Sequence, residues 1–307
     1  MKTRPARARG PIPAILVLGL FLCGLPWPAS AEVGAKGSGY FAATYQFIHT
    51  DGFQASTGEL PAGTTDTHVL NLDFGYHLTD KWFATLGIPL IRKRYQGGSP
   101  HDPSQLDPPR DSEFIDDGSY HTNFQDWYLK LSYLAWNDRS WRIEPFAALG
   151  VPSNDYPFFA ASAVGQNLTE FEIGADVNYT PAISDAWYRV ELAYVFVEKT
   201  LGVSVNHWLV NAEAGYFFSP RWSGRLFMLL KKGDGLDFPD DFPPPRTGEQ
   251  WYQHDRLVKH NYLNVGAGIN WFINERYSLN FSALKTVDAD QVFPVEYAYT
   301  VGMAYSF

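Results

Sequence analysis

Residues 170–179 read Glu-Phe-Glu-Ile-Gly-Ala-Asp-Val-Asn-Tyr, and apolar and polar side chains alternate along them. Successive side chains of a β-strand point to opposite faces, so this stretch predicts a strand with one apolar and one polar face. A tilted strand needs about 9–11 residues to cross a bilayer, and this segment has that length. The stretch therefore predicts a strand of a membrane-spanning barrel.

The same alternation recurs along the chain and gives twelve candidate strands in all. They lie around residues 41–47, 70–76, 82–90, 127–133, 141–149, 170–179, 188–196, 208–216, 222–231, 263–271, 277–283 and 297–307. Short turns are expected at 78–81, 137–140, 181–185, 218–221 and 273–275, and long connections at 49–65, 96–121, 152–166, 197–202, 232–259 and 286–294. Short turns on one side and long loops on the other are typical of outer-membrane barrels.

Aromatic residues support this interpretation, because they flank the short turns. They are Tyr76, Trp82, Tyr133, Trp141, Tyr179, Tyr188, Tyr216, Trp222, Trp271 and Tyr277. Such rings prefer the membrane–water boundary. A soluble β-sandwich or secreted barrel also alternates, but it has no reason to place an aromatic residue beside every short turn. The sequence predicts an all-β, twelve-stranded antiparallel up-and-down transmembrane β-barrel over residues 32–307.

The composition excludes several other classes. Of the 307 residues, 16% are aromatic and 19% charged, against about 25% charged in ordinary globular chains. A mean hydropathy of −0.23 is too polar for a bundle of membrane helices. One Cys excludes a zinc or disulfide framework, and a net charge of −9 argues against a nucleic-acid partner.

Residues 1–31 have the pattern of a secretory signal peptide. Lys2, Arg4, Arg7 and Arg9 precede an apolar run at residues 12–25, and Ala29-Ser30-Ala31 gives a cleavage pattern. The apolar run is too short for a spanning helix, and Leu22 before Cys23 disfavours lipidation. Cleavage would remove four of the 24 basic residues and no acids, leaving 20 bases against 33 acids and a formal charge of −13.

If the apolar residues face lipid, the residues between them face the lumen. The predicted lumen-lining acids are Asp73, Asp126, Glu144, Glu170, Glu172, Asp176, Glu191, Glu213 and Glu296, and the bases are Lys93, Lys130, Arg142, Arg189, Arg225 and Lys231. Both signs are mixed along the chain, which fits either a self-neutralising interior or a narrow, selective lumen. Twelve strands fall between the filled eight-stranded barrel and the open pores of 16–18 strands.

The loops hold two acidic clusters, four Phe residues and several His residues. The clusters are Asp111, Glu113, Asp116, Asp117 and Asp234, Asp237, Asp240, Asp241. Divalent cations prefer oxygen ligands, but neither cluster has a complete calcium-loop spacing, so solvated loop charge is expected. Phe158, Phe159, Phe238 and Phe242 either bind an apolar solute at the mouth or pack on one another.

Catalysis gets little support from the sequence. Ser204 with His207, and His254 with Asp255 and His260, are the neighbours that eight His residues produce by chance. We therefore predict no enzyme, no catalytic residue, no cofactor and no metal site.

The chain ends on Tyr305 and Phe307, with Tyr299, Val301 and Met303 alternating before them. This ending resembles the signal read by the barrel assembly machinery, with Tyr305 and Phe307 as its key positions. The partners expected are that machinery, outer-membrane lipid and lipopolysaccharide, and a small-molecule solute, with no nucleic acid. The location expected is the outer membrane of a Gram-negative bacterium.

One family resemblance can be stated on two motifs. Asp126-Trp127-Tyr128-Leu129-Lys130-Leu131-Ser132-Tyr133, followed by Gly150-Val151-Pro152-Ser153, resembles the outer-membrane channel family named for the meta-pathway of phenol degradation. Gln125 stands where that family tends to have Gly, and Ser153-Asn154 where it has Thr-Gly, while His260, Gly266 and residues 299–307 fit its C-terminal half. The resemblance covers residues 39–307 and transfers no catalytic residue.

The resemblance implies uptake of small, often aromatic or hydrophobic compounds. The sequence thus favours an outer-membrane channel or transporter-like barrel for such solutes. The alternative is a barrel that transports nothing, either a structural or adhesion protein or an enzyme whose site lies in the loops.

Overall fold

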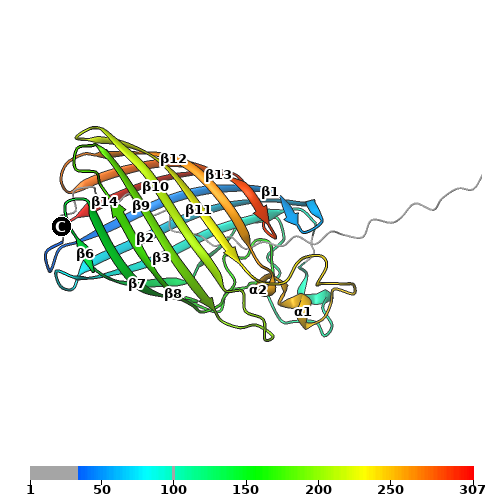
Figure 1. Ribbon diagram of the computed structural model, residues 1–307. Coiled ribbons are helices and arrows are strands. Elements are labelled where there is room, and N and C mark those ends of the chain that lie inside the picture. The colour runs from blue at the N-terminus through cyan, green and yellow to red at the C-terminus, as the bar shows by residue number, and fades with distance from the viewer. Residues whose placement is uncertain (1–33, 99–100) are drawn as a thin grey trace, which may run out of the picture.

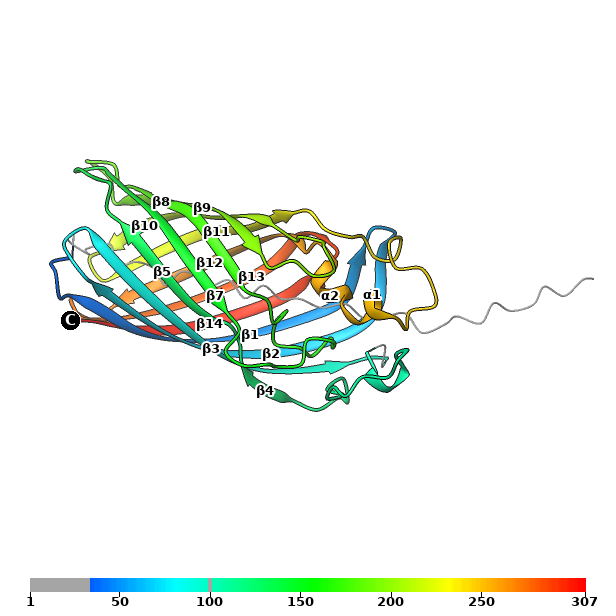
Figure 2. The ribbon, with the colours of Figure 1, turned by 90° about the horizontal axis from the view of Figure 1, so that it is seen from below.

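The computed structural model describes residues 34–98 and 101–307. It is one closed antiparallel β-barrel with two short helices at the end opposite the C-terminus (Figures 1 and 2). The signal peptide expected at residues 1–31, with Cys23, lies outside the described residues. Among the described residues, no helix is long and apolar enough to span a membrane.

Twelve long strands form the barrel wall. They are β1 (Gly39–Ala55), β2 (Gly58–His77), β3 (Trp82–Gln96), β5 (Trp127–Tyr133), β7 (Trp141–Val151), β8 (Glu170–Tyr179), β9 (Ala186–Val197), β10 (His207–Ser219), β11 (Trp222–Gly233), β12 (Asn261–Phe272), β13 (Tyr277–Asp290) and β14 (Val295–Ser306). Each pairs with its neighbour in the chain, and β1 pairs with β14 to close the ring. The predicted twelve-stranded antiparallel barrel is confirmed.

Short elements complete the chain. They are β4 (His121–Phe124), β6 (Trp136–Asn137), the 3₁₀ turn η1 (Pro103–Gln105), α1 (Glu249–Tyr252) and α2 (His254–Leu257). β4 and β5 pair with successive parts of β3, so together they make one interrupted wall strand. The interruption lies beside Pro89, which has no N–H to donate and whose carbonyl accepts from the Gln125 backbone at 3.0 Å.

The five short turns lie where the sequence predicts them, but two expected long loops are strands. β1 and β2 pair to their tips, where Ala55 faces Gly58, so residues 49–65 form a hairpin rather than a loop. β13 likewise continues to Asp290 and replaces most of the loop expected at 286–294. In these added parts of β1, β2 and β13, apolar and polar side chains do not alternate. The sequence pattern therefore ends before the strands do.

The outer surface carries a belt of large apolar side chains. Members of this belt on successive strands are Phe41, Leu70, Leu86, Leu129, Leu149, Phe171, Val190, Leu226, Val265, Phe281 and Val301, all exposed. A soluble protein rarely exposes an apolar patch above a few hundred Å². A closed barrel with such a belt and no free strand edge satisfies its backbone inside lipid, which places this chain in the outer membrane.

Aromatic rings mark the boundary at the short-turn end. Trp82 lies 4.9 Å from Tyr133, Trp141 lies 4.5 Å from Tyr179, and Trp222 stacks on Trp271 at 5.5 Å, all as ring-centroid distances. Neighbouring strands bring these rings together because each pair is directly opposite in the antiparallel register. The long connections and both helices lie at the other end, which is the extracellular end in outer-membrane barrels of known orientation.

Candidate functional site

The inner face of the barrel holds an ion-pair network centred on Arg189 of β9. Its guanidinium bonds to Asp176 on β8, to Glu191 at 3.0 Å and to Glu213 on β10 at 3.2 Å. The register sets this arrangement, because Glu213 is directly opposite Arg189, and Asp176 is directly opposite Glu191. One arginine thus compensates three carboxylates on three adjacent strands.

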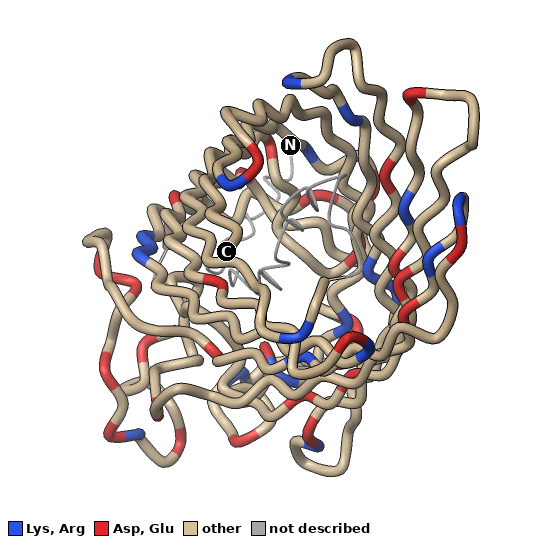
Figure 3. Tube along the Cα trace, turned by 90° about the vertical axis from the view of Figure 1, so that its left-hand side faces the viewer, with Lys and Arg blue, Asp and Glu red and all other residues tan. Residues whose placement is uncertain are grey.

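The network extends over five strands of the wall, and a separate ion pair lies on β7. Arg225 on β11 lies 2.6 Å from Glu213, Lys130 on β5 lies 2.6 Å from Glu191, and Arg142 on β7 lies 2.8 Å from Glu144. Two of these cations also lie over aromatic rings, Lys130 over Phe146 at 3.6 Å and Arg225 over Phe227 at 4.9 Å. Viewed from the short-turn end, acidic and basic residues follow one another along one side of the ring (Figure 3).

The remaining lumen candidates have separate surroundings. Glu172 accepts from the Tyr128 hydroxyl at 3.2 Å, Asp73 from the Asn71 amide at 2.5 Å, and Asp126 from the Tyr156 hydroxyl at 2.5 Å. Glu170 is half-buried and interacts electrostatically with Lys231. Glu296 is exposed near the outer end of β14.

The opposite half of the inner face is polar without this charge network. Gln46 on β1 donates to Thr300 on β14 at 2.9 Å, and Asn270 on β12 donates to Ser223 on β11 at 2.9 Å. The interior is therefore two-sided, with paired charges over β5–β11 and mainly neutral amides and hydroxyls over β12–β14 and β1. The role of any of these residues in solute passage stays a prediction.

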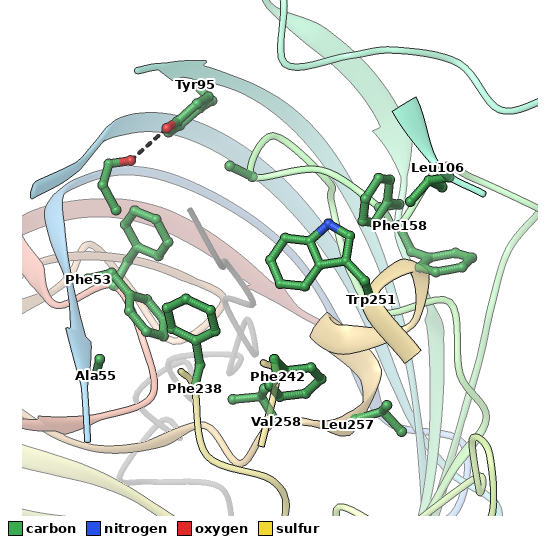
Figure 4. Close-up of a cluster of buried hydrophobic side chains, with 14 residues drawn as sticks. Phe53, Ala55, Tyr95, Leu106, Phe158, Phe238, Phe242, Trp251, Leu257 and Val258 are labelled. Atoms are coloured by element: carbon green, nitrogen blue, oxygen red, sulfur yellow. Dashed lines mark hydrogen bonds between the residues drawn. The ribbon is translucent and has the colours of Figure 1, made fainter. Parts of the chain in front are cut away.

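An apolar cluster of buried side chains lies at the loop end of the barrel (Figure 4). This mouth cluster consists of Phe53, Ala55, Ala62, Tyr95, Leu106, Phe158, Phe159, Ala161, Phe238, Phe242, Trp251, Leu257, Val258 and Phe293, all buried. Its members come from the β1–β2 hairpin, the end of β3, the three longest loops and the β13–β14 turn. Phe53 packs edge-on against Phe238 at 6.1 Å and against Phe293 at 5.4 Å between ring centroids.

The loop of residues 152–169 folds into the barrel beneath the mouth cluster. Its Tyr156 and Val164 pack on inward residues of the far wall, among them Ile48 and Ala298. Lys93 on β3 donates from Nζ to the carbonyl of Ala163 at 2.9 Å, and it is only 2% exposed. This loop therefore crosses the lumen from β7 and β8 to the opposite side.

A buried polar group lies at the base of the mouth cluster, and we call it the histidine cage. It consists of His101, Asp116, His254 and Asp255. The Nε2 atoms of His101 and His254 are 3.3 Å apart, and His254 Nε2 is 3.4 Å from Asp255 Oδ1. Asp116 Oδ2 accepts from His101 Nδ1 at 2.7 Å, and the Trp251 carbonyl lies 2.6 Å from His254 Nδ1.

The cage is held by loops that are distant in sequence. Burial would raise the pKa of Asp116, but hydrogen bonds from His101, the Ala161 amide and Ser162 lower that pKa below its usual value. Burial, with His101 nearby, lowers the pKa of His254 well below its usual value. Asp116 is therefore ionised, and the His254 ring is neutral.

The structure differs from the sequence prediction at one loop acid. The sequence predicts a solvated Asp116, but this residue is buried and bonds to His101 and Ser162. The four loop Phe residues all pack into the mouth cluster, which fits the alternative of mutual packing while leaving solute contact open. His207 contacts the Val205 carbonyl at 3.0 Å.

His101 is the residue that the sequence analysis missed. It lies in a loop with no apolar periodicity, and its partner His254 is 153 residues away. No local pattern links positions that far apart. The sequence prediction of no metal site therefore did not take the contact between His101 and His254 into account.

Comparisons with known proteins rest on structure alone. No protein-family model matches the chain, and no curated protein matches it. The solved COG4313 outer-membrane channel from Pseudomonas putida F1 has a TM-score of 0.67 at 13% identity, covering 91% of this chain and 99% of that one. The translocator domain of the autotransporter NalP from Neisseria meningitidis has a TM-score of 0.50 at 12% identity, covering 89% of each chain.

At these identities the likeness shows the fold. Both proteins are outer-membrane barrels. The sequence resemblance to an outer-membrane channel family agrees with the first of them. The chain is a twelve-stranded barrel with the fold of an outer-membrane channel.

Proposed function

We propose that the protein is a gated outer-membrane channel for small solutes of aromatic or otherwise weakly polar character. The observation that carries this proposal is the mouth cluster, which presents buried aromatic rings at the outer end of a lumen. Apolar pockets with a few polar groups are the usual binding surfaces for small molecules. A solute that passed between the loops would meet these rings before the ion pairs of the barrel wall.

The interior below the cluster supports passage rather than tight binding. Most basic side chains of the interior form ion pairs with neighbouring carboxylates, among them Arg189, Arg225 and Lys130. A wall of compensated charges and neutral amides offers weak, distributed contacts, and conduction needs sites that release as well as bind. Passage requires that the loop of residues 152–169 and the mouth cluster move aside.

A non-transporting barrel is the second candidate, and the same closure favours it. A sealed mouth and a self-neutralised interior are what a structural barrel would show. We expect no enzymatic activity from either form, because His254, Asp255 and His260, which the sequence brings close together, are all buried.

The two candidates differ in what a deletion strain does. A strain lacking the chain should grow more slowly than its parent on low concentrations of aromatic or fatty carbon sources, and equally well on a small hydrophilic sugar. Purified protein in a planar bilayer should give small, discrete conductance steps. Equal growth on every substrate, together with a silent bilayer, would leave the structural barrel as the function.

A further inference from the structure

We propose that the histidine cage is a zinc-class metal site, in which His101 Nε2, His254 Nε2 and a carboxylate oxygen of Asp255 are the protein ligands. These three ligand atoms lie within 4.8 Å of one another, and all three residues are buried. Zn²⁺ is commonly bound by His nitrogen and Asp oxygen, in tetrahedral geometry. Three protein ligands leave one position for water.

The hydrogen bonds fix which ring nitrogens face the centre. A backbone carbonyl only accepts, so His254 must donate from Nδ1 to Trp251. The Asp116 carboxylate accepts from the Ala161 and Ser162 amides, and His101 Nδ1 lies 2.7 Å from it in position to donate. With both Nδ1 atoms donating outward, the two Nε2 atoms face each other across 3.3 Å and are the atoms available to a metal ion.

The two Nε2 atoms face each other among aromatic rings. His254 stacks on Trp251 at 3.9 Å, and Phe159 lies edge-on to both His rings at 5.1 and 5.8 Å. Lys93 interacts electrostatically with Asp116 and Asp255, whereas the two imidazole nitrogens face each other within hydrogen-bond distance, and a low local polarity makes such facing lone pairs costly. A divalent cation at the centre would be bound by both rings and by Asp255, and a single proton shared between the two rings is its competitor.

The surroundings match those of metal-binding histidines. Such a ligand almost always donates its other ring nitrogen to a carboxylate or a backbone carbonyl, which orients the ring. His101 has the carboxylate of Asp116, and His254 has the carbonyl of Trp251. Both orienting contacts are in place.

The site would join loops that have no other covalent or metal link in the described part of the chain. His101 belongs to the loop of residues 97–120, and His254 and Asp255 belong to the loop of residues 234–260. Ser162, from the loop of residues 152–169, bonds Asp116 through its amide and hydroxyl at 2.8 Å. A bound ion would fasten all three loops across the mouth.

The test uses untagged, full-length mature protein in detergent, stripped with a chelator and titrated with Zn²⁺ and with Co²⁺. One equivalent of either ion should bind, and Co²⁺ should give the intense visible bands of a tetrahedral site. X-ray absorption of the Zn²⁺ form should show two imidazole ligands. No uptake, or a bound ion without imidazole, overturns the proposal and leaves the shared proton.

Variants locate the site. His101→Ala and His254→Ala should abolish the stoichiometric binding, and Asp116→Asn should weaken it roughly 10–100-fold. His49→Ala is the matched control, because its Nδ1 also lies 2.7 Å from a carboxylate, Asp66, but it belongs to no such group of ligands. If both His101→Ala and His254→Ala bind the ion as the native protein does, the site is contradicted. If either variant fails to fold, the X-ray absorption spectrum of the native protein decides whether imidazoles bind the ion.

The site rests on loop geometry and not on the proposed function. If the protein binds Zn²⁺ at the cage but neither conducts nor supports growth, the proposed channel function fails and the metal site stands. If it conducts but binds no ion, the metal site fails and the channel function stands.

Discussion

Lys93 Nζ on β3 donates a hydrogen bond to the carbonyl of Ala163 at 2.9 Å, in the loop that connects β7 to β8. The contact ties the loop of residues 152–169 to the barrel wall. A hydrogen bond contributes about 0.5–1.5 kcal/mol, or about 1.5–3 kcal/mol where one partner is charged. We therefore expect Lys93 to act as a latch that holds this loop against the wall.

Removing this latch should open the lumen more often. Lys93→Met keeps the length of the side chain but removes the donor, so the open probability in a planar bilayer should rise about tenfold or more, since 1.4 kcal/mol corresponds to a factor of ten. Lys81→Met, at an exposed short turn, is the control and should behave as native. A bilayer recording that does not distinguish the two variants would show that this loop does not limit conduction.

Ion selectivity should follow the ion-pair network. Lys130→Ala or Arg142→Ala removes one positive charge from the inner face, and a unit charge about 10 Å from a permeating ion in water is worth about 0.4 kcal/mol. The cation gains this energy and the anion loses it, so the cation-to-anion permeability ratio should rise roughly fourfold, measured as a reversal potential across a salt gradient. Arg139→Ala, in a short turn, should leave the ratio unchanged; a shift of equal size there would mean that the effect is not lumenal.

Orientation can be read with a Glu-specific protease, because both ends of the barrel expose a suitable site. Glu113 lies in the loop of residues 97–120 and Glu275 in a short turn, and both are exposed. Intact cells should be cut at Glu113 and spared at Glu275, while permeabilised cells should be cut at both. Cleavage at Glu275 in intact cells would invert the topology.

The closed barrel should resist detergent until it is heated. The ladder between β1 and β14 is closed at its short-turn end, where Gly39 and Phe307 exchange two backbone hydrogen bonds of 3.0 Å. Unheated protein should migrate differently from boiled protein on a gel. Deleting Phe307 should reduce the amount of heat-modifiable protein in the outer membrane; an unchanged amount would deny the last residue a role in assembly.

The barrel could be predicted from sequence because its information is local. Alternation within segments such as residues 170–179, and aromatic residues at positions such as Trp82 and Trp141, reports the strand faces and the turns directly. The extension of β1 to Ala55 could not be predicted, because both faces of that hairpin lie among loops and no longer alternate. The inward acids and bases could be listed, but not their pairing, which depends on the register between strands.

The packing of the loops in the mouth cluster could not be predicted either, and the reason is different. Its contacts join residues very far apart, such as Ser56 and Asp240, whose side chains are 3.0 Å apart across 184 positions. Loops have no periodicity that would announce these contacts. For Phe158 and Phe238, the sequence left two roles open: contact with a solute, or packing against one another.

The contact between Ser56 and Asp240 offers the most direct test of a gated channel. Cys23, the single Cys of the chain, falls in the expected signal peptide, so Ser56→Cys with Asp240→Cys places two thiols alone in the mature protein. Uptake of a labelled small aromatic compound by intact cells is measured with these thiols reduced, and again after they are joined by oxidation or a short bifunctional reagent. The account predicts native uptake when reduced, uptake no faster than in a deletion strain when joined, and recovery on reduction of the disulfide; equal uptake in the joined and reduced states would contradict it.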